Sequence, residues 1–173
     1  MAMPAIGTGP FWRSVVYLLD HDEDGALGVV VNHPLDADVD EVLPHWSPLV
    51  GAPDCLFEGG PVQADAALAL AVVPAGSSLP GWRPAGGQLA LVDLDGPVPP
   101  REQVLGLRVF AGYAGWDAGQ LEGEIAEGAW IVAEAHDEDV FSARPESLWS
   151  RVLGRQSGDI RFLATYPADP GLN

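Results

Sequence analysis

The side chains best suited to chemistry gather on one predicted helix, Asp117–Glu127. At about 100° per residue, Gln120, Glu124 and Glu127 fall within about 60° of one another on one helix face. A carboxylate on such a face could transfer a proton or bind a cation. The alternative is a stripe of solvated charges, which is the usual behaviour of these residue types. The spacing predicts a polar face and leaves both interpretations open.

Sequence signals define both ends of this helix. Asp117 followed by Gln120 is typical of a capping box, and Gly128 stands where a left-handed residue ends a helix. Leu121 and Ile125 are four residues apart and predict the buried side. The glycine-rich run Gly112–Gly119 matches no phosphate-binding loop, so we expect a tight crossing from the preceding strand into the helix.

Two apolar runs near the N-terminus, Trp12–Asp20 and Ala26–Asn32, are joined by Asp24-Gly25. This pattern predicts an antiparallel hairpin. Both runs are apolar at nearly every position, so we expect both of their faces to be covered.

Arg13 lies inside the first of these runs, among aromatic and β-branched neighbours. A buried guanidinium without a partner is costly, so we expect Arg13 to pair with a carboxylate. The candidate partners are Glu58, Glu122 and Glu124.

Metal and nucleophile signals are weak. Asp20–Gly25 matches the opening of a calcium loop, but Val31 stands at the twelfth position, where a bidentate Glu is needed. The four His lack ligand spacing, and Cys55 alone cannot form a Cys-based zinc cage. We therefore predict no catalytic motif, no cofactor and no metal.

The rest of the chain predicts short strands and helices separated by loops rich in Pro and Gly. Three Trp, at positions 116, 130 and 149, are expected in the core, whereas Trp46 and Trp82 lie in Pro-rich loops. The further predicted elements are a helical turn Asp38–Leu43 with Asp38 as cap, a short segment Cys55–Glu58, an apolar run Ala66–Val73, strands Gln88–Leu94, Leu105–Tyr113, Trp130–Ala135 and Ile160–Thr165, and a helix Pro145–Leu153.

Charge excludes several classes of function. The 173 residues include 25 acidic and 8 basic residues, all eight Arg, for a net charge of −17. A nucleic-acid or anionic-membrane partner needs a cationic surface, which this composition lacks. No apolar run is long enough to span a membrane and the N-terminus lacks a signal-peptide pattern, so we expect a cytoplasmic protein.

Four segments taken together resemble the YqgE/AlgH family. They are Phe11-x-Arg13-Ser14-Val15-Val16 leading to His21, Gly25–Asn32 followed by His33-Pro34, Phe57-Glu58-Gly59-Gly60-Pro61-Val62, and Gly112–Gln120 running on through Leu121, Glu122, Glu124 and Ile125 to Trp130. The resemblance implies a single α/β (α+β) domain over residues 1–173. Its sheet would be strongly bent, mixed but mostly antiparallel, and partly barrel-like, with a few packed helices. The family carries an old label as a transcriptional regulator of exopolysaccharide synthesis, and the resemblance supplies no catalytic residue.

The two ends of the chain carry further expectations. Members of the family begin with an apolar strand that ends in Ala-x-Pro, and that strand is missing before Ala2-Met3-Pro4 here. Residues Met1–Ile6 could cover the gap, the true start could lie upstream, or a second copy could pair at the exposed edge. We favour a homodimer. Residues 155–173 are expected to form a loosely ordered tail.

Two functions remain open at this point. The first is a non-enzymatic regulatory or interaction protein that acts through a protein partner. The second is a small-molecule-binding or hydrolytic enzyme with a polar cleft between the N-terminal hairpin and the helix 117–127. The candidate cleft residues are Arg13, His21, Asn32, Gly60, Trp116, Gln120, Glu122 and Glu124.

Overall fold

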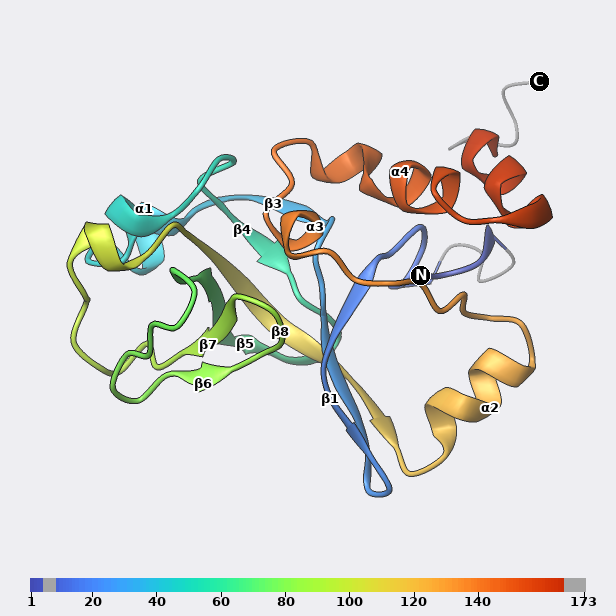
Figure 1. Cartoon of the computed structure of the whole chain (residues 1–173), viewed down its shortest axis with the longest axis horizontal. Coiled ribbons are helices and arrows are strands. Elements are labelled where there is room, and N and C mark those ends of the chain that lie inside the picture. Colours follow the sequence, from blue (N-terminus) through green and yellow to red (C-terminus); the bar gives the residue numbers. More distant parts are fainter. Residues whose placement is uncertain (5–8, 167–173) are drawn as a thin grey trace.

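A computed structural model describes residues 1–4 and 9–166 of the chain (Figure 1). The strands are β1 Val16–Asp22, β2 Gly25–Val30, β3 Pro34–Asp38, β4 Cys55–Glu58, β5 Val62–Val72, β6 Arg83–Pro84, β7 Leu89–Val92 and β8 Gly106–Asp117. The α-helices are α1 Val39–Val42, α2 Gln120–Ala126, α3 Asp137–Val140 and α4 Leu148–Gly154. The 3-10 helices are η2 Ser47–Leu49, η3 Arg101–Gln103, η4 Pro145–Ser147 and η5 Gly158–Thr165.

The long strand β8 organises one curled, mostly antiparallel sheet in the order β1-β2-β8-β5-β7-β6. Strand β4 joins β8 in parallel and carries β3 on its other side. Figure 1 shows α4 lying across one side of the sheet and α2 beside the far end of β8. This is the single-domain, partly barrel-like α+β fold that the family resemblance implied.

The predicted hairpin is confirmed: β1 and β2 pair antiparallel, with Asp22 opposite Gly25. The expectation that both faces of both strands are covered is wrong for β1. Its residues are half-buried or exposed, and Leu18 is 42% exposed. The reason is that β1 is the outermost strand at its end of the sheet, so no further strand of the sheet covers its outer edge.

The helix α4 supplies the largest core cluster. Its buried side chains Trp149, Val152 and Leu153 pack with Phe57 and Phe110 of the sheet. Trp116 and Trp130 form a separate buried cluster with Ala2 and Leu121. All three tryptophans predicted as core residues are therefore in the core, because their large apolar surfaces stabilise the fold when removed from water. Trp46 also plugs the core, and it lies 6.3 Å from the Trp82 ring.

Two predicted strands are wrong. Trp130 forms one isolated antiparallel bridge with Ala2, and the residues that follow it, 131–136, have no regular structure. The predicted strand Ile160–Thr165 is the 3-10 helix η5, in which Leu163 and Ala164 pack against the core cluster around α4. Both segments have apolar residues suited to strands, but the structure pairs neither with the sheet, so packing decides their conformation.

Within the residues that the structure describes, no helix is both long enough and apolar enough to cross a membrane.

Candidate functional site

The carboxylate of Glu124 lies at the centre of a compact hydrogen-bonded cluster. Its Oε2 accepts the indole N–H of Trp116 at 3.0 Å and that of Trp130 at 2.7 Å. Its Oε1 accepts the side-chain amide of Gln120 at 2.9 Å. Burial opposes ionisation of Glu124, but these three donors together lower the pKa of its carboxyl. Glu124 is therefore an ionised carboxylate that holds two tryptophans in place, and each of its oxygens already accepts at least one hydrogen bond.

The start of α2 differs from the prediction. Strand β8 continues to Asp117, which pairs with Gly25, so the glycine-rich run is mostly strand rather than a crossing. The turn into the helix is made at Gly119, whose φ is +74°. Asp117 is not the helix cap. Its backbone N–H nevertheless donates to Oε1 of Gln120 at 3.1 Å, so this half of the predicted capping-box contact forms between the expected two residues, although the helix begins after Gly119.

His21 and Glu122 meet at the tip of the hairpin, where Nε2 of His21 contacts Oε1 of Glu122. Both side chains are largely exposed. The pKa of Glu122 is lowered, first by a backbone hydrogen bond and then by the bond to His21. The pair ties the end of β1 to α2 on the surface.

Arg13 and Asn32 form a different group on the other side of the N-terminal turn. Asn32 is buried, accepts the backbone N–H of Val15 at 2.7 Å and donates to the carbonyl of Arg13 at 2.9 Å. The side chain of Arg13 donates to Ser150 Oγ at 2.9 Å and lies 4.4 Å from the centre of the Trp149 ring. Asn32 thus fixes the turn, and Arg13 fastens it to α4.

The prediction that Arg13 pairs with a carboxylate is wrong. No ion pair of Arg13 exists among residues 1–4 and 9–166, and burial alone lowers the pKa of its guanidinium. Stacking on an aromatic ring is an alternative way to stabilise a half-buried guanidinium, and Trp149 provides it here.

Gly60 allows the chain after β4 to pass close to the backbone of β8 and does not line a cleft. A Cβ atom at this position would lie 2.3 Å from the backbone of Tyr113, and its φ is +151°. Only glycine allows the backbones to approach this closely. The eight predicted cleft residues therefore divide into the Glu124 cluster with His21 and Glu122, the Arg13–Asn32 group, and Gly60.

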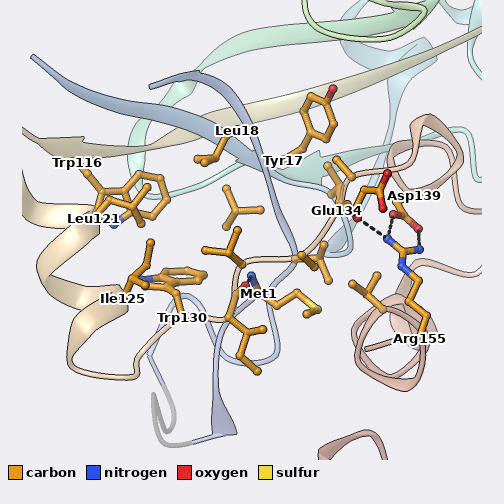
Figure 2. Close-up of a pocket in the computed structure, with 18 residues that line it drawn as sticks. Met1, Tyr17, Leu18, Trp116, Leu121, Ile125, Trp130, Glu134, Asp139 and Arg155 are labelled. Carbon is orange, nitrogen blue, oxygen red and sulfur yellow. Dashed lines mark hydrogen bonds and ion pairs between the residues drawn. The ribbon is translucent and has the colours of Figure 1, made fainter. Parts of the chain in front are cut away.

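A pocket that the sequence did not predict lies beside the Glu124 cluster (Figure 2). We call it the β1 groove: a cavity of about 210 Å³ between strand β1 and residues 131–135, closed at one end by Trp116, Leu121 and Trp130. Leu18 and Val132 line it, and they are 42% and 73% exposed. Of the eight predicted residues, all of which the structure describes, Trp116 lines the groove and the other seven do not.

The opposite end of the β1 groove is polar. Arg155 grips the buried Asp139 with two hydrogen bonds, one of 2.8 Å to Oδ1 and a second to Oδ2. It also donates to the carbonyl of Glu134 at 3.0 Å. The hydrogen bonds to Asp139 raise the pKa of Arg155. This ion pair anchors the end of the wall formed by residues 131–135.

Met1 also lines the groove. Its amino group donates to the carbonyl of Ile131 at 2.8 Å, and the Ile131 N–H donates to the Met1 carbonyl at 2.8 Å. Burial lowers the pKa of this amino group to about 5. The first residues of the chain therefore lie antiparallel beside residues 129–131, with Ala2 and Trp130 forming an isolated bridge.

Neither region gathers metal ligands. Over the part of the chain that the structure describes, no three His, Cys, Asp or Glu side chains converge on one point. Cys55 is half-buried, and burial raises the pKa of its thiol, which disfavours the nucleophilic thiolate.

The fold and the two regions define a single-domain α+β protein with a curled sheet, a stapled tryptophan pair and an apolar groove at the sheet edge. The chain belongs to the AlgH-like family, whose model matches residues 1–161. The relatives include a UPF0301 protein of Streptomyces avermitilis, which is 51% identical over 178 residues, covering 100% of this chain and 92% of that protein. Another is a UPF0301 protein of Thermobifida fusca, 46% identical over 185 residues, with the same coverage of the two chains, 100% and 92%.

Two solved structures share the fold. The crystal structure of a Corynebacterium diphtheriae protein matches with a TM-score of 0.88 and 31% identity, covering 95% of this chain and 88% of that one. The solution structure of the AlgH protein from Pseudomonas aeruginosa matches with a TM-score of 0.69 and 30% identity, covering 98% and 92%.

Proposed function

We propose that this protein is a non-enzymatic interaction protein, located in the cytoplasm, that regulates gene expression indirectly through a protein partner. One observation carries the proposal. The residue best placed for proton transfer, Glu124, is held as an acceptor by two indoles and an amide. A general acid or base must reach a substrate proton, and a carboxylate with both oxygens engaged is poorly suited to do so.

The β1 groove supplies the surface for such an interaction. Its lining is mainly apolar, and it reaches the surface at Leu18 and Val132. An exposed apolar surface of this kind is typical of sites that bind another protein. The net charge of −17 opposes direct contact with DNA, so regulation through a protein is the reading that agrees with the electrostatics.

Site-specific photo-crosslinking in cells tests the proposal. A photoreactive phenylalanine analogue replaces Val132 in the groove, and in a matched control it replaces Leu105, which is 58% exposed and does not line the groove. We expect one adduct of defined mass at position 132, none at position 105, and loss of the adduct when Leu18→Asp is added. Identical adducts at both positions, or none at either, would contradict the proposal.

A second function has one observation in its favour. A cavity of about 210 Å³ with apolar walls is large enough for a small apolar molecule, although smaller than most drug-sized sites. Recovery of a stoichiometric apolar compound from the purified protein by mass spectrometry, reduced by Val132→Asp, would favour this alternative.

A further inference from the structure

We infer that a second cavity of the protein binds a small zwitterion with an apolar body, of the class of an aliphatic amino acid or a short peptide of such residues. The cavity lies beside β6 and β7, at the opposite end of the sheet from β1 (Figure 1). We call it the β7 cavity: a space of about 550 Å³ lined by residues 91–95, Arg83, Gly81, Leu43 and Ala67. The inference goes beyond the proposed interaction function and uses residues of neither the β1 groove nor the N-terminus.

Charges of both signs line this cavity. Antiparallel pairing places Arg83 of β6 opposite Leu91 of β7, and the same register continued by two residues places Gly81 opposite Asp93. Arg83 and Asp93 are therefore diagonal neighbours, and the Cβ atoms of such a pair lie about 7–8 Å apart. Arg83, Asp93 and Asp95 form no ion pair with any residue in the described ranges. A guanidinium and two carboxylates thus share one cavity without neutralising one another.

The carboxylate of Asp93 is held in place with room beside one of its oxygens. Its Oδ1 accepts the backbone N–H of Asp95 at 3.1 Å. Its Oδ2 lies beside two glycines, since a Cβ atom would be 3.0 Å from it at Gly81 and 3.2 Å from it at Gly96. Because glycine has no Cβ atom, a hydrogen-bond donor can occupy such a position, at the distance of about 2.7–2.9 Å that is usual between an ammonium and a carboxylate. Asp95 is exposed and lines the same cavity, so the three donors of an ammonium group find more than one acceptor there.

Apolar side chains form much of the remaining lining. Leu43 and Leu94 both pack against the buried cluster that contains Val92 and Trp46. Trp46 also donates its indole N–H to the Leu94 carbonyl at 3.3 Å, which fixes this wall. A hydrocarbon group placed against the wall would lose contact with water and so gain free energy. The volume of the cavity falls within the usual range of small-molecule sites, about 300–1,000 Å³, so it can hold a molecule longer than one amino acid.

The balance of charge selects against anions. Two carboxylates and one guanidinium give the lining a net negative charge, and the chain as a whole carries −17. This field would repel a phosphate or a dicarboxylate, whereas a zwitterion has no net charge and can place each end beside its complement. Its ammonium would meet Asp93 and Asp95, and its carboxylate would meet Arg83, because a planar guanidinium binds a carboxylate through two parallel hydrogen bonds. Amino acids and short peptides combine these two charged ends with an apolar body.

Isothermal titration calorimetry of the full chain tests the inference with two probes, L-leucine and L-leucyl-L-leucine. Two matched compounds each remove one charged group: N-acetyl-L-leucine lacks the ammonium, and L-leucinamide lacks the carboxylate. We expect saturable binding of at least one probe at one site per chain. The affinity should be at least about tenfold weaker for both matched compounds, since each loses a charge-assisted hydrogen bond. The tighter of the two probes identifies the ligand as an amino acid or as a peptide.

Protein variants assign the two ends of the bound molecule. Arg83→Gln and Asp93→Asn should each weaken binding of the tighter probe about tenfold or more. Arg83→Gln should not weaken binding of L-leucinamide further, because that compound has no carboxylate to lose. The matched controls are Arg161→Gln and Asp36→Asn, which remove exposed charges outside the cavity and should leave the affinity unchanged.

Nuclear magnetic resonance locates the bound molecule in the chain. The amide signals of residues 81–83 and 93–96 should shift on addition of the tighter probe. No saturable binding of either probe at concentrations up to about 10 mM, the weak end of specific recognition, would overturn the inference. Equal binding of L-leucine and L-leucinamide, equal losses in the control variants, or shifts confined to residues that line the β1 groove would also overturn it. None of these outcomes changes the crosslinking expected at position 132, so the two proposals are tested separately.

Discussion

The Glu124 cluster and the β1 groove share two tryptophans but differ in how completely their polar groups are hydrogen-bonded. Trp116 and Trp130 donate their indole N–H groups to Glu124 and also line the groove with their rings. Both indole N–H groups and both carboxylate oxygens of the cluster are hydrogen-bonded, and Phe11 stacks on Trp116 and meets Trp130 edge to face. In the groove, by contrast, one strand edge and one extended segment face each other without backbone pairing among the described residues.

This contrast separates stability from recognition. A satisfied cluster contributes stability because its buried donors keep the bonds they would otherwise make with water. A wall with unpaired backbone groups contributes little stability and can still gain bonds from a partner. The polar residues Gln120 and Glu124 thus hold in place the two tryptophans at one end of the groove. The residues that line the groove itself are mainly apolar.

The largest expected effect concerns the amino group of Met1, in a polypeptide whose first residue is Met1. Burial lowers its pKa from 8.0 to about 5, so between these values the unfolded chain binds the proton and the folded chain does not. Stability should therefore rise with pH across this window, by up to about 4 kcal/mol for a shift of this size. Burial also lowers the pKa of His33, which adds to the rise in the lower part of the window.

Urea unfolding at pH 5, 6, 7 and 8 measures this dependence. The control is the same protein with its N-terminal amino group acetylated, which removes the titrating group. A flatter profile for the acetylated protein is expected. Parallel stability profiles for the two proteins would show that the amino group is solvated in the native state. The end of the groove at Met1 would then be accessible to water.

The next effect tests the Glu124 cluster. Glu124→Ala should lower the free energy of unfolding by about 2–4 kcal/mol, because two indole N–H groups lose their acceptor. Glu124→Gln keeps the shape and one acceptor, and should cost about 1–2 kcal/mol. The matched control is Glu127→Ala, an exposed residue directly after the end of the same helix, with an expected change below about 0.5 kcal/mol.

Acid should erase part of this difference. The lowered pKa of Glu124 means that its contribution is present above the ordinary carboxyl pKa of 4.5 and is lost as the pH falls through the folded value. The difference in unfolding free energy between wild type and Glu124→Ala should therefore narrow as the pH falls below the ordinary carboxyl value. Glu124→Ala as stable as wild type at pH 7 would make the cluster dispensable and remove the contrast with the groove.

The smallest effect concerns the surface pair of His21 and Glu122. His21→Ala should leave the urea midpoint unchanged within error, because exposed ion pairs contribute little to stability. Glu122→Gln is the companion variant that removes the charge from the other side. A loss comparable to that of Glu124→Ala would mean that the hairpin tip needs its tie to α2.

Much of the fold could be predicted from the sequence, because its signals are local. The Asp-Gly turn between two apolar runs predicted the hairpin, and Gly128 with a φ of +79° ends the helix region as expected. The strand predicted at 130–135 is wrong because, among the residues that the structure describes, this segment has one bridge, between Trp130 and Ala2. Local apolar patterning cannot show whether a segment finds a neighbour in the sheet.

The candidate site was harder to predict for a related reason. Polar residues such as Asn32, Glu124 and Arg13 stand out in a sequence, yet the structure engages each of them in a different local contact. The groove is built from Leu18, Val132 and other side chains that resemble ordinary core residues. The apolar start of the segment 131–135 was a signal, but it was interpreted as a strand rather than as one wall of an open site.

The position of β8 in the chain has a consequence for synthesis. Gly28 of β2 pairs with Ala114, which leaves the ribosome roughly 85 residues later. At ordinary elongation rates that interval is roughly 4–17 s, far longer than a hairpin needs to form. During this time the β1–β2 hairpin and β5 exist without the strand that joins them, so their apolar faces are open to chaperones and to one another. Completion of a native sheet waits until about two-thirds of the polypeptide has been made, and a translational pause before Gly106 would lengthen the period in which the nascent chain can aggregate.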